Sequence, residues 1–376
     1  MSDAFGYGII GCGWVASAHA WGVRSLVDDD VRLIGVADRD NARASDVAKR
    51  FDASTTTEDY RALIDNNAIH AVSVCLPDHL HHEVVIAAAE AGKHILCEKP
   101  LSLTLDEADD MLSACDRNGV QLGFVMNHRY AVGNILARRA VASGALGRPL
   151  IASVLHSSGL SSDPGGASPW RGRRRLSTGG VLSTQAIHFL DILLWLGGPV
   201  TAVKAWTDRL ATPDQDYEDT VGLALKMRSG ALATLTATSG SPIMDDLTGT
   251  RVELHGTGGW LLLDGDELRI GELAGGSELT PPQLPPIPSG AEEIVFGSGH
   301  VYEVMDFIRT VRDGGTAPIP GSDGRHLMAV LEAAYRSASD GQAVEVEEPT
   351  SAYSAVAPPN SLLASAVAGR DQMVGR

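Results

Sequence analysis

Short apolar runs alternate with amphipathic stretches between residues 7 and 126. The runs predict strands at Tyr7–Ile10, Val31–Ala37, Ala71–Leu76, His94–Cys97 and Gln121–Met126. Apolar residues at helical spacing predict helices between them, at Val15–Leu26, Asn41–Arg50, His82–Ala91 and Leu105–Asn118. Strands that are separated by helices of this length are typical of βαβ units. This part of the chain is therefore predicted to be a doubly wound α/β domain with a parallel sheet.

Longer stretches with a period of two dominate the second part of the chain. They predict strands at Leu150–His156, Val200–Thr207, Thr220–Met227, Ala231–Thr238, Arg251–His255, Trp260–Leu263 and Glu267–Ile270. Glycine turns such as Ser229-Gly230 join several of them, which favours an open, mostly antiparallel sheet. Helices flanking this sheet are predicted at Asn134–Ser143, Val181–Leu196, His300–Arg312 and Asp323–Ser339. Residues 275–290 are rich in Pro, Gly and Ser and are predicted to be a loop.

The length of 376 residues exceeds what one core usually supports, so we expect two domains. We place the α/β domain at residues 1–126 and an α+β domain at residues 127–348, whose last helices are free to pack back on the first domain. A small, polar, alanine-rich tail follows at residues 349–376. Two alternatives stay open for this tail: disorder, or packing on a neighbouring subunit.

The charge balance excludes some classes of partner. With 30 Lys and Arg against 47 Asp and Glu, the formal net charge is −17, which argues against nucleic acid and anionic membranes. The basic run from Arg171 to Arg175 is one short loop in an acidic chain. No apolar stretch reaches the ~20 residues of a spanning helix. The opening residues lack a basic n-region, so we expect no signal peptide and a cytoplasmic protein.

The cysteines give no sign of a metal centre. All four are irregularly spaced, at Cys12, Cys75, Cys97 and Cys115. None forms a CxxC pair or sits at ligand spacing with histidines, so we expect reduced thiols and no metal site.

A glycine-rich turn follows the first predicted strand. The segment from Gly11 to Ala16 matches the GxGxxA pattern, in which the first glycine makes the turn and the second lets backbone approach a pyrophosphate. The helix that starts here offers free N–H groups to that anion. Asp38 ends the next strand, where a carboxylate binds an adenosine ribose. These features predict a Rossmann domain that binds NAD. NADP is the less favoured alternative, which Arg39 keeps open.

Two further segments carry groups suited to proton transfer. Lys99 follows a predicted strand of the parallel sheet, and ligands of such sheets bind beyond the carboxyl ends of the strands. Thr184, His188 and Asp191 are spaced to share one face of the predicted helix after Gly179-Gly180. A histidine there suits general-base catalysis. A buried structural histidine remains the alternative for this segment taken alone.

Taken together, these motifs resemble the glucose–fructose oxidoreductase/inositol dehydrogenase family, Gfo/Idh/MocA. The resemblance covers about residues 5–347. It rests on the turn at 11–16, Cys75–His81, Glu98-Lys99-Pro100, Trp170-Arg171 and the 179–191 segment. It implies an NAD(P)-dependent dehydrogenase that oxidises or reduces a ring carbinol carbon of a sugar, sugar derivative or cyclitol. Homodimers or homotetramers that form through the second sheet are implied too.

The resemblance also assigns roles to individual residues. It implies Lys99 and His188 as catalytic residues, with Lys99 bonded to the reacting oxygen, and we expect Asp191 to position His188 or a substrate hydroxyl. Expected cofactor contacts are Gly11, Gly13, Trp14, Val15, Asp38, Arg39, Leu76, Pro77, His81, Glu98, Lys99, Asn127, Trp170 and Arg171. Expected substrate contacts are Lys99, Arg129, His156, Arg171, Thr184, His188 and Tyr302, with a structural role left open for His156 and Tyr302.

Two departures from the family pattern matter. Thr184 stands where many inositol dehydrogenases carry an aspartate, so the proton relay reduces to Lys99 and His188. Asp78 stands where asparagine is usual. Two alternative functions stay open: a redox-neutral NAD-dependent glycosidase or lyase that uses the same lysine and histidine, and a dinucleotide-binding sensor without chemistry.

Overall fold

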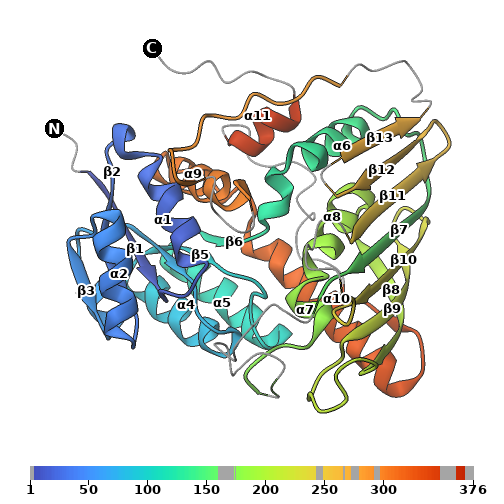
Figure 1. Cartoon of the computed structure of the whole chain (residues 1–376), viewed down its shortest axis with the longest axis horizontal. Coiled ribbons are helices and arrows are strands. Elements are labelled where there is room, and N and C mark those ends of the chain that lie inside the picture. Colours follow the sequence, from blue (N-terminus) through green and yellow to red (C-terminus); the bar gives the residue numbers. More distant parts are fainter. Residues whose placement is uncertain are drawn as a thin grey trace.

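The computed structural model describes residues 4–159, 173, 175–242, 249–265, 267–271, 279–291, 297–347 and 361–368. Two sheets dominate it (Figure 1), one at each end of the molecule, with helices between them. The predicted fold class is confirmed: a parallel sheet in the first part of the chain and a mostly antiparallel sheet in the second. No helix in the described ranges is both long and apolar enough to cross a membrane.

The first sheet is parallel, with six strands in the described residues and the order β3-β2-β1-β4-β5-β6. Its strands are β1 Phe5–Ile10, β2 Val31–Ala37, β3 Thr55–Thr57, β4 Ala71–Val74, β5 His94–Cys97 and β6 Leu122–Phe124. The connecting helices are α1 Ala16–Arg24, α2 Asn41–Phe51, α3 Arg61–Ile64, α4 His81–Glu90 and α5 Leu105–Asn118, with 3₁₀ turns η1 Val27–Asp29 and η2 Asp78–Leu80. The strand order reverses between β1 and β4, and ligands of such sheets bind at that point.

Local sequence sets the ends of several of these helices. The Thr104 hydroxyl accepts from the N–H of Glu107, whose carboxylate in turn accepts from the N–H of Leu103. This reciprocal cap starts α5. Gly119, at φ 65°, ends the same helix in a left-handed conformation that costs glycine little. These local contacts explain why α5 has the bounds that the sequence predicts.

The second sheet has the order β13-β12-β11-β7-β10-β9-β8-β14, and among its described strands only β7 and β10 run parallel. Its strands are β7 Pro149–Ser157, β8 Val200–Asp208, β9 Thr220–Met227, β10 Leu232–Thr238, β11 Thr250–Gly256, β12 Trp260–Asp264, β13 Glu267–Gly271 and β14 Val344–Glu345. Buried and exposed side chains alternate along β7, β9 and β10. One face therefore packs on helices and the other points outward.

The remaining helices lie between the sheets (Figure 1). They are the 3₁₀ turn η3 Asn127–Tyr130, α6 Val132–Ala142, α7 Val181–Thr184, α8 Ile187–Gly197, α9 Gly299–Arg312, α10 Gly321–Asp340 and α11 Leu362–Ala368. Helices α8 and α10 pack on the second sheet, and α9 packs on α1 of the first domain. The division at residues 126 and 348 stays a prediction.

Three expectations about the elements are corrected. The helix predicted at Val181–Leu196 is interrupted at Gln185 and Ala186, which separates α7 from α8. The short elements β3, α3 and β14 were not expected, because each has too few residues for a periodic pattern. In the tail, α11 packs on α6 and α9 of its own chain, and the carboxylate of Asp306 accepts from the N–H groups of Leu362 and Leu363.

Candidate functional site

The glycine-rich turn follows β1, as the sequence predicts. Gly11 has φ +94°, and a Cβ there would lie 2.2 Å from the carbonyl oxygen of Cys75. Only glycine fits both the conformation and the close approach to the loop after β4. The carboxylate of Asp38 accepts from the N–H of Cys12 at 2.7 Å, so the end of β2 is fixed against the turn.

The same turn leaves room for a ligand. A Cβ on Gly13 would meet no atom within 4 Å, in contrast to Gly11. Val15 is the N-cap residue of α1, whose first turn carries no acidic side chain, and Trp14 beside it is half-exposed. Asp38 keeps further lone pairs for hydroxyl groups, and Arg39 next to it is exposed. These residues fit a dinucleotide, with the pyrophosphate on the helix N-terminus and the ribose on Asp38.

The loops after β4 and β5 lie side by side, joined by a buried histidine. The two ring nitrogens of His81 contact the carbonyl oxygens of Leu76 and Pro100, each at 2.9 Å. His81 is fully buried, so it holds the two loops together instead of facing the cofactor as expected. Pro77 and Leu76 remain partly exposed at the end of β4. The Lys99–Pro100 peptide bond is cis.

Glu98 is also turned inward. Its carboxylate lies 3.1 Å from Nε2 of His19 on α1 and 3.5 Å from Nε2 of His300 on α9. Burial alone would raise the pKa of Glu98, but the bonds to these two histidines hold it well below its usual range. The N–H of Lys99 donates to the same carboxylate. Glu98 therefore joins α1, α9 and the end of β5 beneath Lys99. Its side chain makes these contacts in place of the direct cofactor contact that was expected.

Lys99 itself reaches across to the second domain. Its Nζ donates to the carbonyl oxygen of Thr184 at 2.6 Å. The Thr184 hydroxyl donates to the carbonyl of Gly180, one helical turn earlier. A substrate that took the proton of this hydroxyl would have to replace that bond. The two glycines before α7 are required by close packing: a Cβ on Gly179 would meet the Tyr335 hydroxyl, and one on Gly180 would meet the carbonyl of Glu218.

His188 on α8 lies in the same half-exposed region as Lys99. Its ring is 4.7 Å from that of His128 on η3. Removal from water, together with the nearby charge of Lys99 and the rings of His128 and His300, lowers the pKa of His188 well below its usual 6.5. Burial likewise lowers the pKa of His128 to about 3. At neutral pH both rings are uncharged and can accept protons.

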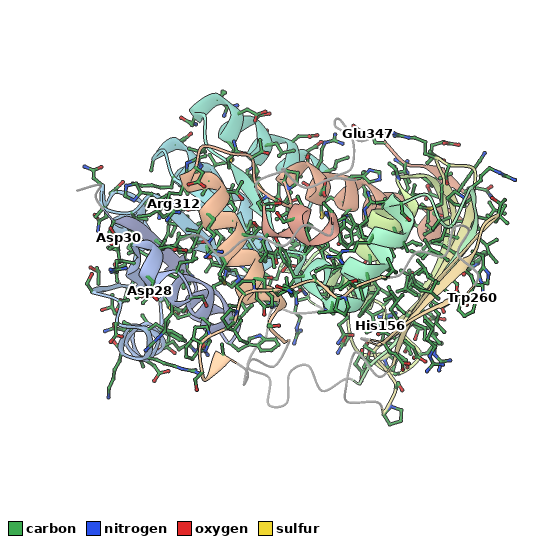
Figure 2. The ribbon with its side chains drawn as sticks, turned by 90° about the horizontal axis from the view of Figure 1, so that it is seen from above. Asp28, Asp30, His156, Trp260, Arg312 and Glu347 are labelled. Carbon is green, nitrogen blue, oxygen red and sulfur yellow. The ribbon has the colours of Figure 1, made fainter. Side chains whose placement is uncertain are left out.

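Three buried polar atoms near His188 have no partner in the described part of the chain. They are Oδ1 of Asn127, Nδ1 of His188 and Nε2 of His156. His156 on β7 is fully buried and packs against Phe189 with ring centres 4.7 Å apart. Figure 2 shows it on the opposite side of the molecule from Asp28 and Asp30. Unmet hydrogen-bonding capacity of this kind is typical of a site that receives a polar ligand.

A buried cluster of charged side chains corrects two predictions: the substrate contact of Arg129 and the positioning of His188 by Asp191. Asp191 accepts from Nε and Nη2 of Arg129 at 2.8 and 2.5 Å, and Nη1 of the same guanidinium donates to Asp323. Arg129 has no exposed surface. Its side chain therefore cannot touch substrate in this arrangement. Nδ1 of His188 has no hydrogen-bond partner, and the contacts of Asp191 fix Arg129 instead of orienting that ring.

The other expected contacts are less informative. Tyr302 is buried in α9, with its hydroxyl bonded to Ser298. Trp170 and Arg171 lie outside the described residues. No group of three or more His, Cys, Asp or Glu in the described ranges is arranged to hold a metal, and the four cysteines are free.

Sequence reasoning missed His19 and His128. Both are histidines within otherwise ordinary segments, one in an alanine-rich helix and one directly after the last parallel strand. The position of His128, beyond the carboxyl end of β6, is the signal that pointed to Asn127 and Arg129 beside it. His19 offered no comparable signal, because its partner Glu98 is 79 residues away.

Comparisons with known proteins agree with this fold. A model of the "Oxidoreductase family, NAD-binding Rossmann fold" matches residues 5–126, and the "GFO/IDH/MocA C-terminal domain" model matches residues 135–262. Levoglucosan dehydrogenase of Pseudarthrobacter phenanthrenivorans is 29% identical over 91% of this chain and 98% of that protein. Myo-inositol 2-dehydrogenase of Thermotoga maritima is 27% identical over 91% and 98%. A solved levoglucosan dehydrogenase in complex with NADH and levoglucosan superposes with TM-score 0.81, at 27% identity over 92% of this chain and 99% of that one.

Substitutions at the two glycines of the turn should have different effects. Gly11→Ala should lower the melting temperature, because its Cβ would collide with the Cys75 carbonyl in a left-handed conformation. Gly13→Val should leave the melting temperature within about 2 °C but weaken NADH binding by roughly 50-fold or more, since its side chain would fill the space next to the helix N-terminus. Thermal unfolding and NADH fluorescence titration measure the two effects. Wild-type affinity in Gly13→Val would contradict this placement of the cofactor.

Proposed function

Because the chain belongs to the GFO/IDH/MocA family of NAD-binding oxidoreductases, we propose that it oxidises a ring carbinol carbon of a sugar or cyclitol, with Lys99 and His188 as its acid–base pair. The observation that carries the proposal is the meeting of these two side chains from different domains, next to partnerless polar atoms. The relatives named for levoglucosan and myo-inositol support a cyclic polyol as the substrate class.

Lys99 serves as the charged donor. An ammonium has three N–H donors, and the one held by the Thr184 carbonyl fixes the direction of the others. We assign one of these to the reacting oxygen of the substrate. As the C–H bond breaks, negative charge grows on that oxygen. A fixed ammonium in a partly dry site stabilises it by several kcal/mol.

His188 serves as the base. Its lowered pKa keeps the ring neutral at physiological pH, so a ring nitrogen is free to take the hydroxyl proton. Bound NAD supplies the nicotinamide ring that receives the hydride. The ring of His128 limits the orientation of His188 from one side, and His156 and Asn127 add polar atoms able to bond neighbouring substrate hydroxyls.

The test of this function is NADH formation at 340 nm, with NAD and a panel of levoglucosan, myo-inositol, glucose and alkyl glucosides. We expect turnover with one class of cyclic polyol. Lys99→Met should lower kcat about 100-fold or more while the Kd for NADH changes less than about threefold. Lys49→Met, on the exposed surface of α2, is the matched control and should keep full activity. Glycoside cleavage without net NADH would instead favour the redox-neutral alternative.

The lowered pKa of His188 predicts how kcat/KM depends on pH. A base works only when deprotonated, and the pKa of His188 lies well below 6.5. We therefore expect kcat/KM to stay level as the pH falls to 6.5 and to decline only below it. In His188→Asn that acidic decline should disappear and the rate should drop about 10²–10⁴-fold. His82→Asn, at a surface histidine paired with Asp110, is the control. An acidic limb at or above pH 6.5 that survives in His188→Asn would count against the assignment.

We also propose that two copies of the chain associate through the outer face of the second sheet. Large apolar side chains stand exposed on β7, β10 and β8, with exposed fractions of 54% for Ile151, 61% for Leu232 and 62% for Trp206. Ile151 and Leu232 are register partners on β7 and β10, so they form one continuous patch. Such a patch is unusual on a monomer.

Replacing Trp206 and Leu232 together by Glu should convert an oligomer into a monomer, because it places two charges in the proposed interface. Light scattering coupled to size exclusion at about 20 µM chain measures the mass. Val27→Glu, at an exposed apolar residue of η1 in the first domain, should leave the mass unchanged. A wild-type chain that elutes as a monomer would refute the proposed association.

A further inference from the structure

The interruption between α7 and α8 exposes a backbone acceptor. In a continuous helix the N–H of His188 would donate to the carbonyl of Thr184. Here it donates to the carbonyl of Gln185 at 3.3 Å, and Gln185 itself has φ −124° and ψ −57°, outside helical geometry. The Thr184 carbonyl is thereby released from the helix, and it is this oxygen that accepts the bond from Nζ of Lys99.

A hydrogen bond from a residue next to the second sheet holds the interruption in place. The hydroxyl of Ser158 donates to Oε1 of Gln185 at 2.7 Å. Ser158 is fully buried, its N–H donates to the carbonyl of Thr238 on β10, and its carbonyl accepts from the N–H of Ser241. The side chain that holds the interruption is therefore itself held at two backbone points.

The start of α7 is fixed by a second residue, Glu218. The carboxylate of Glu218 accepts from the N–H groups of Gly180 and Leu182 and from the Tyr335 hydroxyl. The carbonyl of Glu218 accepts from the N–H of Val181. With one end fixed by Glu218 and the other by Ser158, the four residues of α7 cannot shift the Thr184 carbonyl without breaking one of the two attachments.

From this arrangement we infer that Gln185 and Ser158 are positioning residues for Lys99: their bond holds the helix interruption that presents the Thr184 carbonyl to the lysine ammonium. The inference rests on the proposed function only for the catalytic role of Lys99. Neither side chain touches the reacting atoms in this account. They act through the backbone of Thr184, so removing either of them should free Lys99 without unfolding the chain.

The test is competitive labelling of lysines with acetic anhydride in the full-length chain, read out by mass spectrometry of the Lys99 peptide. Ser158→Ala and Gln185→Ala each remove the same bond. Each should raise the reactivity of Lys99 about threefold or more, because a bond to a charged donor is among the stronger ones in proteins. The double variant should give no more than either single one, since both act through one contact.

Lys93 is the internal control. Its Nζ also donates to backbone carbonyls, those of Asn66 and Ile69, which lie in the first domain, away from Gln185 and Ser158. Its reactivity should stay unchanged in every variant. Ser337→Ala removes another buried serine of the second domain, which bridges α10 and β8, and should leave Lys99 as it is in wild type.

Two results would overturn the inference. One is an unchanged reactivity of Lys99 in both single variants. The other is an increase in reactivity that Lys93 shares, which would mean that the whole structure has loosened. In the NADH assay the two variants should lower kcat about fivefold or more with an unchanged KM for NAD. If Lys99→Met keeps its turnover, the proposed function fails, whereas the labelling result still decides whether Gln185 and Ser158 position Lys99.

Discussion

A guanidinium without access to solvent fixes the centre of this molecule. Arg129 lies where the last strand of the parallel sheet meets the helices of the second domain, and its charge is balanced by Asp191 on α8 and Asp323 on α10. Removing one partner of a buried pair typically costs about 3–5 kcal/mol, because the remaining charge stays dehydrated. The packing of η3, α8 and α10 against one another therefore depends on all three charges being present together.

The geometry of the site follows from that cluster. His128 precedes Arg129 on η3, and His188 lies one turn before Asp191 on α8, so fixing the ion cluster also fixes the two rings 4.7 Å apart. Lys99 enters from the end of β5, where Glu98 is held by His19 and His300 from two further helices. Buried clusters centred on Arg129 and on Glu98 thus lie behind the half-exposed Lys99, His128 and His188.

Motifs made of neighbouring residues were predicted well from the sequence, and contacts between distant residues were not. The turn at Gly11 and Gly13, Asp38 at the end of β2 and the glycines before α7 are local patterns with one steric explanation each. The inward turn of Glu98 and of His81, and the pairing of Asp191 with Arg129, depend on partners far away in the chain. The interruption at Gln185 escaped prediction for the same reason, since helical spacing continues through it while its cause, Ser158, lies on another element.

The threonine at position 184 now has a physical explanation. Many inositol dehydrogenases of the family carry an aspartate four residues before the histidine, and a carboxylate near His188 would raise the pKa of its ring. With Thr184 there, burial lowers that pKa and the nearby Lys99 and His128 lower it further, while the Lys99 ammonium donates to a neutral carbonyl. A carbonyl orients the ammonium without neutralising it. In the proposed mechanism this ammonium is the group that stabilises the oxygen on which negative charge develops.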